Sequence, residues 1–175
     1  MKKFVTSAVL SAILVFFVSV GSAFAGWHDL TQTGRNHAIH DEAVANNNTY
    51  GGECKPWVQN IVSWASGGVV TVPLTTNNGH GYTWEYSPDV GEMYNGIEDL
   101  NVHVGMIVQM RIKYSDGSYG PHTAIIYQKN SSGITWIESN YSGDGMVCIR
   151  YYFETYQHFY DSLEYPWSYS IYYIK

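Results

Sequence analysis

The sequence predicts an α+β fold in which N-terminal helices pack on an antiparallel sheet, and three observations support this prediction. Residues 54–65 carry apolar side chains at helical spacing. From about residue 104 onward, short runs rich in β-branched and aromatic residues follow one another. These runs are separated by turn dipeptides such as Asp116-Gly117 and Asp144-Gly145. Helices first and hairpin-connected strands second are typical of the α+β class.

The predicted helix at residues 54–65 places a cysteine at its first turn. A Gly51-Gly52 turn precedes Cys54, and Pro56 stands where a missing backbone N–H costs nothing. Gly67-Gly68 ends the helix. The apolar positions fall at i, i+4, i+7 and i+8, and they are Trp57, Ile61, Trp64 and Ala65. We therefore expect this stripe to face a core.

A thiol at this position is a candidate nucleophile. The positive end of the helix dipole and the adjacent Lys55 both favour thiolate over thiol at Cys54. The alternative is a small buried cysteine, or one half of a disulfide with Cys148, the second cysteine of the chain. Cys148 lies among apolar neighbours, which favours a buried and inert thiol.

The first 25 residues predict a secretory signal. Lys2 and Lys3 precede an apolar run from Ala8 to Val20, and Ala23-Phe24-Ala25 is a small-x-small cleavage site. The run is shorter than the ~20 residues that span a membrane. We expect cleavage after Ala25 and a secreted or periplasmic protein with one domain at residues 26–175.

Charge excludes two classes of partner. Without Lys2 and Lys3, seven basic residues oppose fifteen acidic ones, a net charge of −8. Nucleic acids and anionic membrane surfaces both select basic faces, so neither is an expected partner. We also expect no integral membrane segment, and a monomer.

The remaining elements are read from local patterns. Residues 37–44 predict a short helix, and Val69–Val72 predicts a short strand. Residues 73–101 read as one long connection, rich in Gly, Asn, Pro and aromatic residues, of the kind that often binds ligands. Further strands are predicted at 106–112, 122–127, 134–141, 146–153 and 168–174.

Three polar residues of the predicted sheet complete a possible site with Cys54. His122 opens one strand, and Glu138 and Asn140 lie two apart on the next, so both point to the same face. A cysteine nucleophile needs an imidazole base, and the imidazole needs a third group to orient it. Cys54, His122 and either Glu138 or Asn140 supply these parts. The alternative is a strand histidine with ordinary polar neighbours.

Four segments carry a resemblance to a known family. These are Glu53-Cys54-x-x-Trp57-Val58, Gly105-Met106-Ile107-Val108, Gly120-Pro121-His122-Thr123-Ala124-Ile125-Ile126 and Ile137-Glu138-Ser139-Asn140-Tyr141. Together they resemble the CHAP domain, which belongs with the NlpC/P60 group of papain-like cysteine amidases and peptidases. The resemblance covers roughly Thr49 to Arg150 and implies a papain-like fold.

The resemblance also implies roles. It implies Cys54 as nucleophile, His122 as base, and Glu138 with Asn140 orienting or polarising the histidine. Tyr50 is similar to an aromatic residue that helps line the oxyanion site in such enzymes. The implied substrate is bacterial peptidoglycan, cleaved at an amide bond of the stem peptide or between sugar and peptide.

The chain departs from the family pattern in two places. Gly105-Met106 stands where the family often has Gly-Asp, and the calcium-binding run Asp-x-Asp-Gly of some relatives is missing. His37, His40 and Asp41 lie close in sequence, but no third histidine or cysteine follows at a zinc-site spacing, so we expect no metal and no cofactor.

Recognition of a glycan or peptide is expected from aromatic side chains rather than charge. Tyr82, Trp84, Tyr86 and Tyr94 all lie in the long connection at residues 73–101 and are candidate stacking surfaces. Their alternative role is to pack this connection onto the sheet. Two other functions stay open: a non-catalytic glycan- or peptide-binding module on the same fold, and an acyltransferase that uses the same cysteine and histidine.

Overall fold

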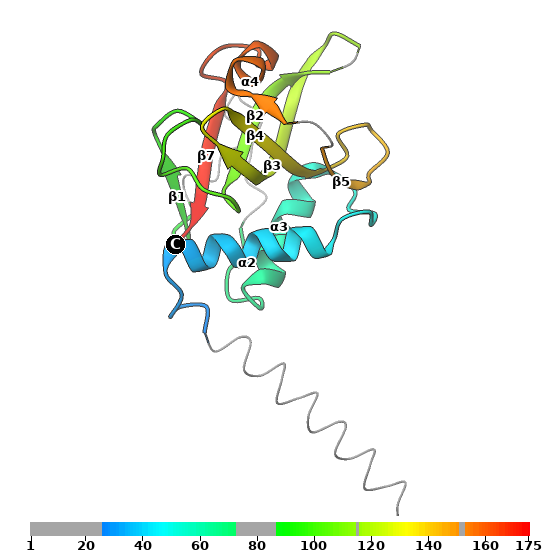
Figure 1. The fold of residues 1–175 in the computed structure, drawn as a ribbon. Helices are drawn as coiled ribbons and strands as arrows, with labels where there is room; N and C mark the ends of the chain where they lie inside the picture. Colours follow the sequence, from blue (N-terminus) through cyan, green and yellow to red (C-terminus); the bar gives the residue numbers. More distant parts are fainter. Residues whose placement is uncertain (1–25, 73–86, 115, 151–152) are drawn as a thin grey trace, which may run out of the picture.

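The computed structural model describes residues 26–72, 87–114, 116–150 and 153–175, and this part of the chain has an α+β fold (Figure 1). Its three helices are α2 (Gln32–Ala45), α3 (Cys54–Ala65) and α4 (Tyr156–Ser162). Its seven strands are β1 (Val90–Met93), β2 (Ile107–Lys113), β3 (Tyr119–Asn130), β4 (Gly133–Ser139), β5 (Val147–Ile149), β6 (Glu154–Thr155) and β7 (Tyr169–Ile174). The predicted fold class is therefore confirmed at this level.

All seven strands belong to one antiparallel sheet. Its strand order is β1-β7-β2-β3-β4-β5, and β6 pairs with the first two residues of β4, Gly133 and Ile134. Strands β2 to β5 form the predicted meander, because each pairs with its neighbour in the chain. The last strand, β7, returns to lie between β1 and β2. The meander places His122 on β3 next to Glu138 on β4.

Local sequence accounts for the bounds of both large helices. The Thr31 side chain caps α2 by accepting a hydrogen bond from the Gly34 N–H at 3.1 Å. Helix α3 begins at Cys54 and ends before Gly67 and Gly68. Their φ angles of 66° and 82° lie in the left-handed region, which glycine adopts without the steric cost that a Cβ atom would add. The predicted helix at 54–65 is confirmed, and the one predicted at 37–44 belongs to the longer α2.

Side chains that alternate along the strands build two cores, one on each face of the sheet. In Figure 1, α2 and α3 lie on one side of the strands, and α4 lies on the opposite side. The core under α2 and α3 takes Ile107, Ile125, Ile137 and Tyr172 from the sheet. The core under α4 takes Val108, Ala124, Trp136 and Ile171. His122 and Glu138 share the alternation of Ala124 and Trp136, so their side chains belong to the α4 face.

Three local predictions were wrong. Val69–Val72 is not a strand: Val70 N–H donates to Ser66 Oγ and Val72 C=O accepts from Gln59, so side chains of α3 and its C-cap hold the segment. Of the strand predicted at 146–153, the described residues form a strand only at β5, Val147–Ile149. Trp64 does not join the buried stripe of α3, since it is 51% exposed. The pattern also missed β1 and α4, which burial in the tertiary structure stabilises.

Some predictions lie outside the described residues. These are the signal at 1–25 and the binding loop residues Tyr82, Trp84 and Tyr86.

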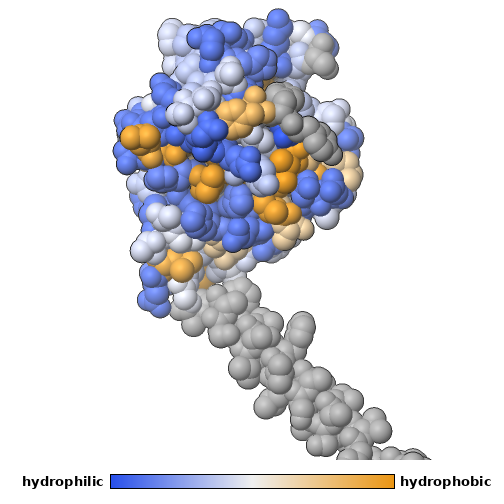
Figure 2. All heavy atoms as spheres, viewed as in Figure 1, coloured by the Kyte–Doolittle hydropathy of each residue, from blue (hydrophilic) through white to orange (hydrophobic). Residues whose placement is uncertain are grey.

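On the face drawn in Figure 2, hydrophobic residues form small separate groups among hydrophilic ones. Within the described ranges, no helix has the length and apolar character needed to cross a membrane.

Candidate active site

Cys54 is the first residue of α3 and is 8% exposed. The chain before it is bound to the turn between β4 and β5: the N–H groups of Gly51 and Gly52 donate to the Gly145 carbonyl at 2.8 and 2.9 Å. Ser139 Oγ donates to the Gly52 carbonyl at 2.6 Å. A Cβ on Gly51 would lie 2.6 Å from that same Oγ, so glycine is required for this close approach. The sheet therefore sets where the helix, and its thiol, begin.

The His122 imidazole lies between Cys54 and Glu138. Its Nε2 is 2.7 Å from Glu138 Oε2, and both side chains are at most 2% exposed. Its side chain also hydrogen-bonds the Cys54 thiol. Because Nε2 is engaged with the carboxylate, Nδ1 is the ring nitrogen available to the sulfur. The structure thus joins a thiol, an imidazole and a carboxylate in one chain of hydrogen bonds.

Arg150 extends this chain beyond Glu138, and sequence reasoning missed it. Its Nε donates to Glu138 Oε1 and its Nη2 to Oε2 at 2.9 Å, a two-pronged ion pair between side chains that are 7% and 0% exposed. The residue follows β5, where its backbone N–H donates to the Trp136 carbonyl at 3.1 Å. An arginine directly after a predicted apolar strand could have indicated a buried ion pair. Only the β4–β5 register shows that its partner is Glu138.

The electrostatics shift Cys54 toward the thiolate and His122 toward the imidazolium. Burial alone would raise the pKa of Cys54, but the hydrogen bond and positive charge of His122 outweigh it and lower the pKa. Burial alone would lower the pKa of His122, yet its bonds to Cys54 and Glu138 raise it to about 9. Burial opposes the ionised form of Glu138 too, but the charge of Arg150 and the bond to His122 hold its pKa at about 2. Ionised Glu138 can therefore stabilise a protonated imidazole.

Backbone N–H groups around the sulfur could stabilise a developing anion. Those of Lys55, at the start of α3, and of Thr123, next to His122, both hydrogen-bond Cys54 and lower the pKa of its thiol. The first turn of a helix has N–H groups without intrahelical partners, which suit an oxyanion. The arrangement has the donors that acyl transfer to a cysteine requires.

Asn140 hydrogen-bonds the β4–β5 turn and the start of α3. It follows β4 with a left-handed φ of 62°. Its Oδ1 accepts from the Gly145 N–H at 2.8 Å, and its Nδ2 donates to Glu53 Oε2 at 3.2 Å. These bonds close the β4–β5 turn and hold the N-cap residue of α3. Asn140 thus supports the segment that carries Cys54, whereas Glu138 contacts His122.

Tyr50 also contacts the β4–β5 turn. It forms an isolated β-bridge with Met146, and its ring lies so close to Gly145 that a Cβ there would come within 2.5 Å of it. The side chain is 77% exposed. Tyr94, from the predicted aromatic set, is 89% exposed and lines a hollow of about 250 Å³ with Pro166 and Trp167, not with Cys54.

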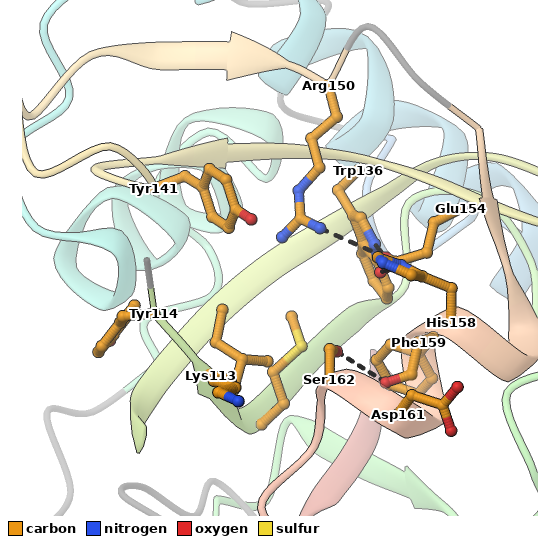
Figure 3. A pocket seen from close by; sticks show the side chains of 12 residues that line it. Lys113, Tyr114, Trp136, Tyr141, Arg150, Glu154, His158, Phe159, Asp161 and Ser162 are labelled. Carbon is orange, nitrogen blue, oxygen red and sulfur yellow. Dashed lines mark hydrogen bonds and ion pairs between the residues drawn. The ribbon is translucent and has the colours of Figure 1, made fainter. Parts of the chain in front are cut away.

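A pocket of about 410 Å³ adjoins the site on the α4 side (Figure 3). Tyr141 and Arg150 are shared between the two: the Tyr141 ring meets His122 edge-on at a centroid distance of 6.0 Å, and Arg150 lies 4.1 Å from the centroid of the same ring. Figure 3 shows the Arg150 side chain extending into the pocket between Tyr141 and Glu154. The pocket gives small solutes access to the guanidinium.

Metal ligands do not gather in the described ranges, where no group of three or more His, Cys, Asp or Glu side chains is arranged to hold an ion. His40 instead bonds Asp41 at 3.0 Å and stacks on Tyr127. Both cysteines are free thiols, so the Cys54–Cys148 bridge is not formed.

The two cysteines should differ in reactivity. Cys148 is half-buried and lies opposite Glu138 in the β4–β5 register; burial and that negative charge raise the pKa of its thiol. The pKa of Cys54 is lowered instead. We expect iodoacetamide at about pH 6.5 to alkylate Cys54 roughly tenfold or more faster than Cys148, as peptide mass mapping would measure. Equal rates at the two thiols would contradict the ion pair.

Comparison with protein-family models, with curated proteins and with solved structures gave no match. The functional argument therefore depends on the geometry of the site and on the motifs of the sequence.

Proposed function

We propose that the protein is a cysteine hydrolase in which Cys54 is the nucleophile, His122 the general acid and base, and Glu138 the group that orients the imidazole. The observation that carries this proposal is a continuous chain of hydrogen bonds. It runs from the Cys54 thiol to the His122 imidazole, and from His122 Nε2 to Oε2 of the buried Glu138 at 2.7 Å. A structural ion pair would need no thiol at a helix start, no bond from that thiol to the imidazole, and no backbone N–H groups that donate to the sulfur.

The reaction follows from these positions. The Cys54 thiolate attacks a carbonyl carbon, and a C–S bond forms while the oxygen gains negative charge. N–H groups at the start of α3 donate to this oxyanion. The His122 imidazolium then gives its proton to the leaving nitrogen, and the C–N bond breaks. Neutral His122 takes a proton from water, which attacks the acyl-enzyme and releases the acid with the thiolate restored.

The proposed substrate is peptidoglycan, and the bond is an amide of the stem peptide or the one between sugar and peptide. This part of the proposal depends on the resemblance of the motifs around Cys54, His122 and Glu138 to CHAP domains of papain-like fold. The order of a helix that carries the cysteine before a sheet that carries the histidine is compatible with that fold. The predicted export signal would deliver the enzyme to the compartment where this substrate lies.

Digestion of purified sacculi tests the substrate. The protein should release soluble fragments that mass spectrometry can identify, and the Cys54→Ala variant serves as the matched control. New amino termini within stem peptides indicate an endopeptidase, whereas glycan freed from intact stems indicates an amidase. Saturable binding without release from several wall types would favour a binding module instead. Products extended by an added amine would favour acyl transfer.

A further inference from the structure

We propose that Arg150 is a positioning residue of the Cys54 site: it keeps Glu138 ionised and correctly turned so that the carboxylate can hold His122. This inference rests on the proposed function, which it deepens by adding a fourth residue to the chain Cys54–His122–Glu138. Arg150 acts through Glu138, and no contact with substrate is required of it.

The first argument is geometric. The guanidinium fork engages both carboxylate oxygens of Glu138, Nε on Oε1 and Nη2 on Oε2 at 2.9 Å. Two parallel bonds prevent the carboxylate from rotating about its own axis. The oxygen held by Nη2 is the same Oε2 that lies 2.7 Å from His122 Nε2. The orientation of Glu138 toward the imidazole is therefore set by Arg150.

Arg150 is itself fixed in place. Its Nη1 donates to Glu154 Oε2 at 3.3 Å, and its guanidinium lies 4.1 Å from the centroid of the Tyr141 ring. Glu154 is anchored in turn, because Trp136 Nε1 donates to it at 2.6 Å. A guanidinium between a carboxylate and an aromatic face has little freedom to leave. These contacts make Arg150 a rigid support for Glu138 rather than a mobile counter-charge.

The second argument is electrostatic. Glu138 is 0% exposed, and a carboxylate without solvent ionises only where charges of opposite sign surround it. The titratable and charged groups next to it are His122 from β3, Cys148 opposite it on β5 and Arg150 after β5. Glu154 of β6 lies behind Arg150, and Cys54 of α3 lies behind the imidazole. Of these, Arg150 is the one cation that stays charged at every relevant pH.

Loss of Arg150 should therefore make Glu138 titrate in mild acid. A protonated Glu138 no longer stabilises the imidazolium, and without an imidazolium Cys54 reverts to a thiol. Arg150 thus sets the lower pH limit of the reactive thiolate. A lysine at this position would keep the positive charge but lose the two-pronged geometry. We therefore expect Arg150→Lys to keep the lower pH limit of the thiolate but to reduce turnover.

The test is the pH dependence of Cys54 alkylation by iodoacetamide in the full protein, read by peptide mass mapping. In Arg150→Met the acid limb of the rate should move up by about one pH unit or more, which slows alkylation roughly tenfold at the acid end. Arg150→Lys should keep an acid limb close to that of the wild type. Arg111→Met is the matched control, because it removes another partly buried arginine ion pair, that with Glu164, which does not involve Glu138.

Thermal unfolding of each variant separates positioning from general stability. An acid limb in Arg150→Met that coincides with that of Arg111→Met and the wild type would overturn the proposal. If Arg150→Met does not fold, Arg150→Lys decides through turnover: hydrolysis by this variant equal to that of the wild type would show that the two-pronged geometry is dispensable and overturn the proposal.

Chemical rescue provides an independent measurement. Arg150 lines the 410 Å³ pocket, so Arg150→Ala leaves a path for a small cation to reach Glu138. Guanidinium at about 20 mM should restore alkylation at the acid end, whereas urea of the same shape and concentration should not. Equal effects of both solutes would contradict an ionic role. Alkylation requires no substrate, so these results stand apart from whether peptidoglycan is cleaved.

Discussion

Replacing Cys54 with alanine should abolish hydrolysis, with a loss of roughly 10⁴-fold or more in turnover. In the proposed reaction the Cys54 thiolate forms the covalent bond to the substrate, and alanine offers no atom that could replace it. The fold should survive, because the backbone bonds from Gly51 and Gly52 to Gly145 that place the start of α3 do not involve the thiol. Release of soluble fragments from sacculi, measured with thermal unfolding, checks both expectations.

Cys148→Ser is the matched control for this variant. It removes the other free thiol, which lies across from Glu138 but has no place in the chain from Cys54 to His122. We expect turnover within a few-fold of the wild type, because serine is close in size to cysteine and the thiol it replaces takes no part in the proposed reaction. Full activity in Cys54→Ala, or equal losses in the two variants, would be incompatible with a nucleophilic Cys54.

Replacing Glu138 with glutamine should lower turnover by roughly 10²- to 10⁴-fold, the range expected when the orienting carboxylate of such a triad is neutralised. Glutamine cannot stabilise the imidazolium, so the pKa of His122 should fall from about 9. Activity requires the imidazolium, and the alkaline limb of the pH–rate profile should therefore move to lower pH. Steady-state kinetics across the pH range measure both effects.

This variant needs a stability control, because glutamine leaves the buried Arg150 without its carboxylate. Breaking a buried ion pair from one side costs about 3–5 kcal/mol. Glu138→Asp keeps the charge and should retain more stability, while its shorter side chain weakens the bond to His122. Activity that follows unfolding temperature across both variants, with no shift of the alkaline limb, would indicate a structural role alone.

Asn140→Ala provides the comparison within the predicted pair. Asn140 bonds Gly145 and Glu53 rather than His122, so its loss should loosen the β4–β5 turn and the start of α3. We expect a fall in turnover of about tenfold or less, together with a loss of about 1–3 kcal/mol in stability. A greater loss of turnover in Asn140→Ala than in Glu138→Gln would reverse the roles proposed for the two residues.

The sequence alone predicted those features that depend on neighbours in the chain. Helix α3 and its first residue, Cys54, follow from apolar spacing, an early proline and the glycines at both ends. The meander follows from alternation and turn dipeptides, which also set His122 and Glu138 on adjacent strands. These signals are local, so they are readable before the chain is folded.

The tertiary structure decided what depends on strand register and on packing between distant segments. Arg150 meets Glu138 because β5 pairs with β4 so that Cys148 lies opposite the carboxylate, and no local pattern encodes that register. Asn140, two residues from Glu138, hydrogen-bonds Gly145 and Glu53, and its φ of 62° turns the chain at the end of β4. Strand β1 exists because β7 pairs with it, after a return of more than seventy residues along the chain. The proposed nucleophile and base were thus predicted from local sequence patterns, whereas the residues that support them come together only when distant strands pair.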